Sequence, residues 1–541
     1  MAQSGYVPRA QQAHNKAVVE RRVPILAGAT GFLLLSGPAE GWAHGFAQRY
    51  DLPVPLGLFL AGAGATVALS FVLLAASGRD RPRAADRPAP RLLLPALGRL
   101  LSNAWLTTSL QTIAAALLVL IVAAGFFGNQ NPYRNIAPTF AWIIWWVGMM
   151  FINTLIGDVW ALVNPWSAVF VGAEGILRRL KPRARLALER PYPERLGIWP
   201  AVALFLAFAW LELVSGEGES PRTLAVIITV YSLITWAGMF VFGRGTWLNH
   251  GEAFTVVFST FARFAPMAFH AGAPRGGGTR CPHGWETSTG DTVGCAVCFD
   301  EAAPANRALV LRPPGAGLLV TRPVSVSLLA MVLSLLATVA FDGVLATPLW
   351  TNYYLYFKDL DALRPLWRGP WVPVGSEFHV LATLMFLLFP LLFATIYLGV
   401  CRITAAAADG AMTTLETARY FILTLLPIAI AYHLSHYLTY LVLGGQYIIP
   451  TLSDPFGFGW DLFGTASYQA DIGLIGARFH WYTAVIAIVL GHVIAVYLAH
   501  RTATRLVEDR RTAFRSQLPM LALMVGYTML SLWIISQPTV G

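Results

Sequence analysis

The sequence predicts an all-α, polytopic membrane helix bundle with about ten transmembrane helices. Of its 541 residues, 56% are hydrophobic and only 12% are charged. A soluble domain carries about 25% charged residues, so most of this surface must meet lipid. About 20 apolar residues cross a bilayer core, and ten stretches are long enough: 56–77, 106–127, 138–157, 198–215, 222–243, 324–345, 377–401, 417–443, 477–499 and 518–536.

Residues 1–43 are expected to be a secretory signal peptide. A polar start that ends in Arg21-Arg22 precedes a short apolar run and a group of small residues before Ala43. The apolar core of a signal peptide has about 7–15 residues, which is too short for a span. Cleavage after Ala43 would make His44 the N-terminal residue. The alternative is an uncleaved first helix.

Basic residues concentrate in the loops 78–99, 158–197 and 500–517, which share one side of the membrane if the ten stretches cross it in turn. Cytoplasmic loops are enriched in Lys and Arg, so this side is expected to be the cytoplasm and both mature termini to lie outside. Topology thereby accounts for the net charge of +10, and no nucleic-acid partner is expected. The chain then divides into N-terminal membrane helices (44–243), a cytoplasmic loop (244–323) and a C-terminal membrane bundle (324–541).

Stretch 417–443 carries the main functional candidates. Residues three and four apart share one face of a helix, so His433, His436, Tyr437 and Tyr440 form a polar stripe. Imidazoles within a span usually face the bundle interior, where they relay protons or bind a metal or cofactor. The alternative is a structural role, in which each histidine only makes a hydrogen bond between helices.

Further histidines flank this stripe towards the outer side. His480 and His492 lie on the next helix, where twelve residues separate them and turn them about 120° apart. His379 opens the preceding helix, and His44 would also lie outside. Asp342, near the outer end of its helix, neutralises a cation or orients a histidine, and the alternative is that it simply lies at an exposed helix end.

Several imidazoles in one region favour a divalent transition metal, zinc or copper, bound by His433, His436 and His492. Water bound to such an ion becomes a nucleophile near neutral pH, as hydrolysis of a phosphate ester requires. Two alternatives remain. The same residues form a relay in a transporter or metal-handling protein, or histidines of two facing helices bind a b-type haem.

A second cluster lies in the cytoplasmic loop, as Cys281-Pro-His283 and Cys295-Ala-Val-Cys298. Its four soft ligands suit a closed, structural zinc site. The first half is similar to a Rieske motif, but a Rieske centre has histidine where this chain has Cys298, so zinc is expected. The reducing cytosol argues against disulfides. The alternative is a mobile loop with incidental thiols.

Seven strings spread over nearly the whole chain carry a resemblance: AHGFAQRYDLPVP, NIAPTFAWIIWW, GDVWALVNPW, YPERLG, FAWLELV, YHLSHYLTYL and LWIISQP. With these strings the chain resembles a family of bacterial multi-pass membrane proteins called fenitrothion hydrolases. The resemblance implies a protein of the bacterial inner membrane that hydrolyses a phosphotriester. The expected partners are the lipid bilayer, a small-molecule or ion substrate and a second membrane subunit.

Overall fold

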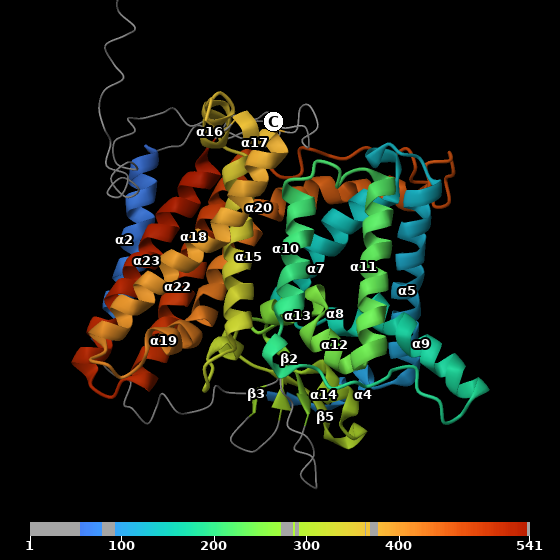
Figure 1. The fold of residues 1–541 in the computed structure, drawn as a ribbon, viewed down its shortest axis with the longest axis horizontal. Coiled ribbons are helices and arrows are strands. Elements are labelled where there is room, and N and C mark those ends of the chain that lie inside the picture. The colour runs from blue at the N-terminus through green and yellow to red at the C-terminus, as the bar shows by residue number, and fades with distance from the viewer. Residues whose placement is uncertain are drawn as a thin grey trace, which may run out of the picture. The chain divides into compact units, whose positions relative to one another are not determined.

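The computed structural model describes residues 55–77, 92–271, 285–286, 292–362, 364–367 and 377–537. The predicted signal peptide, His44, Cys281 and His283 lie outside these residues. Within the described residues, ten helices are long and apolar enough to cross a membrane. This confirms the predicted all-α, multi-pass helix bundle, and every span overlaps the stretch that the sequence assigned to it (Figure 1).

Most spans are single helices: α2 (Leu56–Ser77), α5 (Ala104–Phe127), α11 (Pro221–Phe242), α15 (Val326–Leu345), α18 (Glu377–Ala407), α22 (Ala477–Leu506) and α23 (Arg510–Ser536). The third span consists of α6 (Ile136–Pro138), the π-helix η3 (Thr139–Val147) and α7 (Gly148–Leu155), and the fourth of η4 (Glu194–Leu196) and α10 (Trp199–Leu213). The eighth span consists of α19 (Thr414–Phe421), η7 (Ile422–Leu425), α20 (Leu426–Leu443), η8 (Gly444–Tyr447) and α21 (Ile448–Ser453).

Shorter helices connect these spans. They are α4 (Pro95–Leu101), η2 (Pro132–Arg134), α8 (Trp160–Val163), α9 (Pro165–Leu180), α12 (Arg244–His250), α13 (Ala253–Ala262), α14 (Ala296–Glu301), η5 (Pro304–Asn306), η6 (Ala316–Leu318), α16 (Pro348–Lys358) and α17 (Arg364–Trp367).

Side-chain caps fix where several helices begin. The side-chain oxygens of Asn103, Ser325 and Asp509 accept backbone N–H groups in the first turns of α5, α15 and α23, respectively. Asn164 caps α9 in the same way, and Pro165 follows it at the first helical position. Such caps satisfy N–H groups that have no partner within the helix.

The helices pack as two connected groups. In one group α20 lies against α22, α22 against α23, and α18 against α15 and α23. In the other group α5 lies against α9 and α11, while α13 lies against α7 and α10. Contacts of α10 with α15 and of η3 with α20 join the groups. The first span, α2, packs on α22 and α23, so it lies with the helices of 324–541 although it belongs to 44–243 in sequence.

Proline interrupts the helix that was expected over 417–443. A short 3₁₀ segment, η7, precedes Pro427, which occupies the first turn of α20. Proline cannot donate the backbone hydrogen bond that a continuous α-helix needs at this point. A Cβ atom on Gly491 of α22 would lie 2.7 Å from the Pro427 carbonyl oxygen, so α22 approaches this break closely because residue 491 is glycine.

A small antiparallel sheet, which the sequence did not predict, lies at one end of the bundle. Its strands are β1 (Leu92–Leu94), β2 (Met267–Ala271), β3 (Trp285–Glu286), β4 (Thr292–Val293) and β5 (Arg307–Leu311), in the order β1-β5-β2-β4-β3. β1 follows the first span and β5 follows the fifth, and Leu93 pairs with Val310. This pairing agrees with alternate crossings, which put both segments on one side. Figure 1 shows the sheet at the end opposite α16 and α17.

Above the sheet lies α13, a helix of 10 residues that is buried along most of its length. The carboxylate of Glu252 accepts the backbone N–H groups of Phe254 and Thr255 at its start. At its end the guanidinium of Arg312 donates to the carbonyl oxygens of Ala262 and Arg263, both at 3.0 Å. Both helix ends therefore find their hydrogen-bond partners inside the protein.

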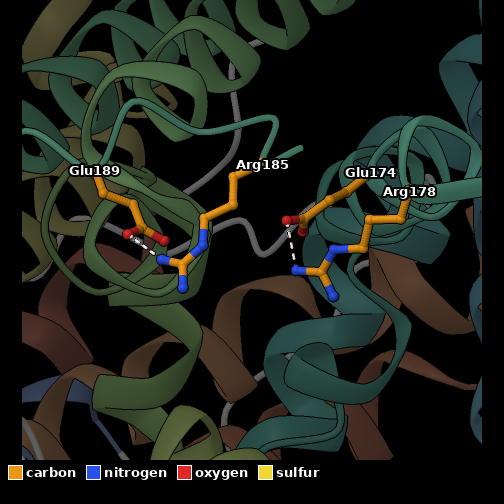
Figure 2. A network of polar contacts seen from close by, with 4 residues as sticks. All are labelled: Glu174, Arg178, Arg185 and Glu189. Carbon is orange, nitrogen blue, oxygen red and sulfur yellow. Dashed lines mark hydrogen bonds and ion pairs between the residues drawn. The ribbon is translucent and has the colours of Figure 1, made fainter. Parts of the chain in front are cut away.

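The basic loop 158–197 contains two local ion pairs. Arg178 lies 2.8 Å from Glu174, and Arg185 lies 2.5 Å from Glu189, as Figure 2 shows. All four side chains are partly or largely exposed, so each pair contributes at most about 1 kcal/mol. Membrane orientation follows the number of Lys and Arg residues rather than the net charge of a loop, so these pairs leave the predicted orientation unchanged.

Candidate acid–base site

The centre of the candidate site joins α15 to α20. Nε2 of His436 lies 2.9 Å from Oδ2 of Asp342. The hydroxyl of Tyr437 donates a hydrogen bond of 2.6 Å to the same oxygen. Of the interpretations of Asp342, the structure agrees with the one in which it orients a histidine. The pair lies about 10 Å below the end of α20 at Leu443, since a helix rises 1.5 Å per residue.

His433 lies one turn earlier on α20 and is only 7% exposed. Its ring centroid is 4.6 Å from that of Tyr437 and 6.3 Å from that of Trp146. Its Nε2 atom is buried without a hydrogen-bond partner among the described residues. His433, His436 and Tyr437 thus face the interior, as the polar stripe predicted. Tyr440, at the outer end of the stripe, is 43% exposed.

A small cavity of about 30 Å³ adjoins His433. Glu212 of α10 and Trp146 of η3 line it together with His433 and Tyr437. Nε1 of Trp146 is buried and interacts with the Glu212 carboxyl. A cavity of this volume is large enough for one water molecule, which needs two to four polar partners of the kind found here. The Glu212 carboxyl also lies within electrostatic range of Asp342.

The arrangement brings together two carboxyl groups, two imidazoles and a phenol at membrane depth. Groups of this kind accept and donate protons and exchange them with water within hydrogen-bond reach. Charged groups inside a membrane protein are costly, and those present usually serve ion or proton pathways. The site is therefore suited to acid–base chemistry.

The remaining predicted histidines lie elsewhere. Nδ1 of His480 lies 2.8 Å from Oγ1 of Thr439, nearer the outer end of α20. His492 is 1% exposed, its Nδ1 lies 2.8 Å from the carbonyl oxygen of Ile488, and its ring lies 6.0 Å from that of Tyr527. His379 is exposed at the start of α18.

No group of three or more His, Cys, Asp or Glu side chains within the described ranges is arranged to hold a metal ion. His436 pairs with the carboxylate of Asp342, whereas the ring of His492 lies near Tyr527 of α23. Neighbouring helices decide this placement, which the spacing of residues along one helix does not reveal. Zinc or copper bound by His433, His436 and His492 stays a prediction.

In the cysteine loop, the thiol of Cys295 accepts the backbone N–H of Cys298 at the start of α14. Cys298 is disulfide-bonded. The expectation of reduced thiols rested on a cytosolic location, and a disulfide sulfur is not the thiolate that zinc requires. Because Cys281 and His283 lie outside the described residues, the zinc site of this loop stays a prediction.

Sequence reasoning missed Glu212 and Trp146 as parts of the site. Glu212 is a carboxylate inside the apolar string FAWLELV, and an ionisable residue within a span is by default a functional candidate. Trp146 lies in the nine-residue π-helix η3, a conformation that often marks functional sites. Only the first of these signals was available from the sequence.

In comparisons with known proteins, no family model, curated protein or solved structure matches the chain.

Proposed function

We propose that this protein moves protons through the acid–base site and couples their movement to transport of a small molecule or ion. The observation that supports this most directly is the hydrogen-bonded group of Asp342, His436 and Tyr437, with His433 beside it. A carboxylate and an imidazole within hydrogen-bond distance exchange a proton readily, and chains of such groups form the relays of pumps and transporters.

Further buried groups extend this chain towards the basic side of the bundle. The hydroxyl of Tyr432 and Nε2 of His492 are buried without hydrogen-bond partners among the described residues. Tyr432 lies within electrostatic range of both Asp342 and Tyr527, and the Tyr527 ring neighbours His492. Nδ1 of His500 lies 2.9 Å from Oε1 of Gln517, further along α22. Water molecules between these groups would complete the relay.

In the other direction, His480 and Thr439 lead towards the outer end of α20. The proposal includes a location in a bacterial inner membrane, with the basic loops in the cytoplasm and both termini outside. The proposed substrate is a small molecule or ion, and the proposed partner is a second membrane subunit.

Hydrolysis of a phosphotriester is the second candidate, and the cavity shared by Glu212 and His433 favours it. Either residue is a base that could take a proton from a water molecule held there. The oxygen of that water would bond to phosphorus while one P–O ester bond breaks, and the alkoxide or phenoxide that leaves would take up a proton from the protonated base or from water. The resemblance to fenitrothion hydrolases points to the same reaction. Zinc or copper at the histidines would assist it by lowering the pKa of the water.

The test uses purified protein in proteoliposomes that enclose a pH-sensitive dye. An imposed pH gradient should dissipate faster with the wild-type protein than in empty vesicles. The Asp342→Asn and His433→Gln variants should lose this flux, because each removes a proton-accepting group. The His379→Asn variant is the matched control, since His379 is exposed outside the site, and it should retain the flux.

The same preparations separate the alternatives. Wild-type flux in the Asp342→Asn variant, or no flux in any sample, would contradict the relay. Turnover of fenitrothion that disappears in the Glu212→Gln and His433→Gln variants would favour the hydrolase. Metal analysis and a visible spectrum of the purified protein test for bound zinc, copper or haem.

A further inference from the structure

We infer that a second, apolar cavity in this protein binds the hydrocarbon chain of a bilayer lipid. The cavity measures about 530 Å³ and lies among α5, η3, α10 and α11. Small-molecule sites in proteins span about 300–1,000 Å³, so this cavity has the size of a specific site. The inference does not depend on the proposed proton relay.

The cavity opens towards the region that lipid tails occupy. Several of its lining residues on the spans α5 and α11 are exposed side chains, including Ile113 at 58%, Val230 at 50% and Ile234 at 40%. Both helices are apolar enough to cross a membrane. The mouth of the cavity is therefore continuous with the lipid-facing surface, and a molecule enters it sideways from the bilayer.

The two helices that frame the mouth approach each other closely near one end. A Cβ atom on Gly125 of α5 would lie 2.5 Å from the Pro221 carbonyl oxygen and 2.6 Å from Cβ of Ala225 on α11. The backbones are in direct contact there because residue 125 is glycine. The cavity lies beside the middle parts of both helices, between Leu110 and Ile121 of α5 and between Leu224 and Ile234 of α11, and aromatic rings form its floor.

Three polar atoms of that floor already have hydrogen-bond partners within the protein. Nε1 of Trp142 donates to the Gly218 carbonyl oxygen at 2.8 Å. Nε1 of Trp166 donates to Oγ of Ser232, also at 2.8 Å, and the Tyr231 hydroxyl donates to the Glu252 carboxylate. A polar ligand would lose its hydration here without replacement hydrogen bonds. A hydrocarbon chain has no such cost.

An unfilled space of this size would also deprive its lining side chains of dispersion contacts. An acyl chain restores those contacts and remains attached to a headgroup in the membrane. The occupant would lie one aromatic layer from the acid–base site, because the adjacent residues Trp145 and Trp146 of η3 line the large and the small cavity, respectively.

Photo-crosslinking tests this inference on the full chain. The protein is reconstituted with phosphatidylcholine that carries a diazirine near the end of one acyl chain, and labelled peptides are mapped by mass spectrometry. We expect labelling to concentrate on the cavity-facing peptides of α5 and α11. Filling the cavity with Ala114→Trp should remove most of this labelling.

Ala116→Trp is the matched control, because Ala116 is an exposed alanine two residues away on the same helix and does not line the cavity. It should label like the wild type, and both variants are compared only as monodisperse preparations in gel filtration. Uniform labelling of all membrane-facing helices, or equal labelling of the two variants, would mean annular lipid only and would overturn the inference. So would labelling of these peptides by a diazirine-bearing small aromatic compound but not by the lipid.

Discussion

Replacing Asp342 by alanine tests how much the contacts of its carboxylate contribute to the free energy of unfolding. The change removes one oxygen that His436 meets at 2.9 Å and Tyr437 meets at 2.6 Å, in side chains that are largely buried. A buried group left without its partner costs about 1–3 kcal/mol, and breaking a buried charged pair costs roughly 3–5 kcal/mol. We therefore expect Asp342→Ala to lower the free energy of unfolding by about 3–5 kcal/mol. Asp342→Asn keeps an acceptor oxygen for Tyr437 and should cost about 1–2 kcal/mol.

A double-mutant cycle with His436→Phe isolates the contact between the two side chains. Unfolding is followed in detergent micelles by denaturant titration for the wild type, both single variants and the double variant. Residues in direct contact show interaction energies of about 0.5–3 kcal/mol, and we expect a value in the upper half of that range. An interaction energy near zero, or equal losses for Asp342→Ala and Asp342→Asn, would refute the reasoning.

Three further predictions concern helix packing, pH and capping. Gly491→Val should weaken the α20–α22 contact by about 1–3 kcal/mol, because a Cβ there would lie 2.4 Å from Cβ of Ala431; a melting temperature equal to that of the wild type would contradict this. Burial raises the pKa of Asp158 to about 6, so its ionisation destabilises the folded state as pH rises from about 4 through 6. The free energy of unfolding of Asp158→Asn should match that of the wild type near pH 4 and exceed it at pH 8 by about 3 kcal/mol, as melting curves across that range would reveal. Asn164→Ala removes the cap of α9 and a hydrogen bond to Thr255, and should cost about 1–2 kcal/mol in the same assay, whereas Asn164→Asp should retain the cap.

Hydropathy was enough to locate the spans because lipid demands a continuous apolar surface. Hydropathy does not predict which segments far apart in the sequence pair with each other. Leu92–Leu94 is a three-residue strand whose partner, β5, follows more than 200 residues later, and neither segment carries a strand pattern long enough to recognise. The break before Pro427 was visible in the sequence, but the close approach of Gly491 to it was not.

The candidate site, too, could be predicted from the sequence only in part. Helical periodicity correctly put His433 and His436 on an interior face, because it describes neighbours along one helix. Which residues meet that face depends on how neighbouring helices are rotated, and no period within one helix reports this. Asp342 was considered as a partner of a histidine, whereas Glu212 was overlooked because it is a single carboxylate in an otherwise apolar string.

Helix α13 has an electrostatic consequence for that site. A helix normally presents about half a positive charge at its start and half a negative charge at its end. Here the Glu252 carboxylate and the Arg312 guanidinium compensate the two poles at once. Phe261, near the end of α13, lines the small cavity beside His433 with an apolar ring. The field at His433 is therefore governed by the charges of Asp342 and His436, and this short helix contributes little to it.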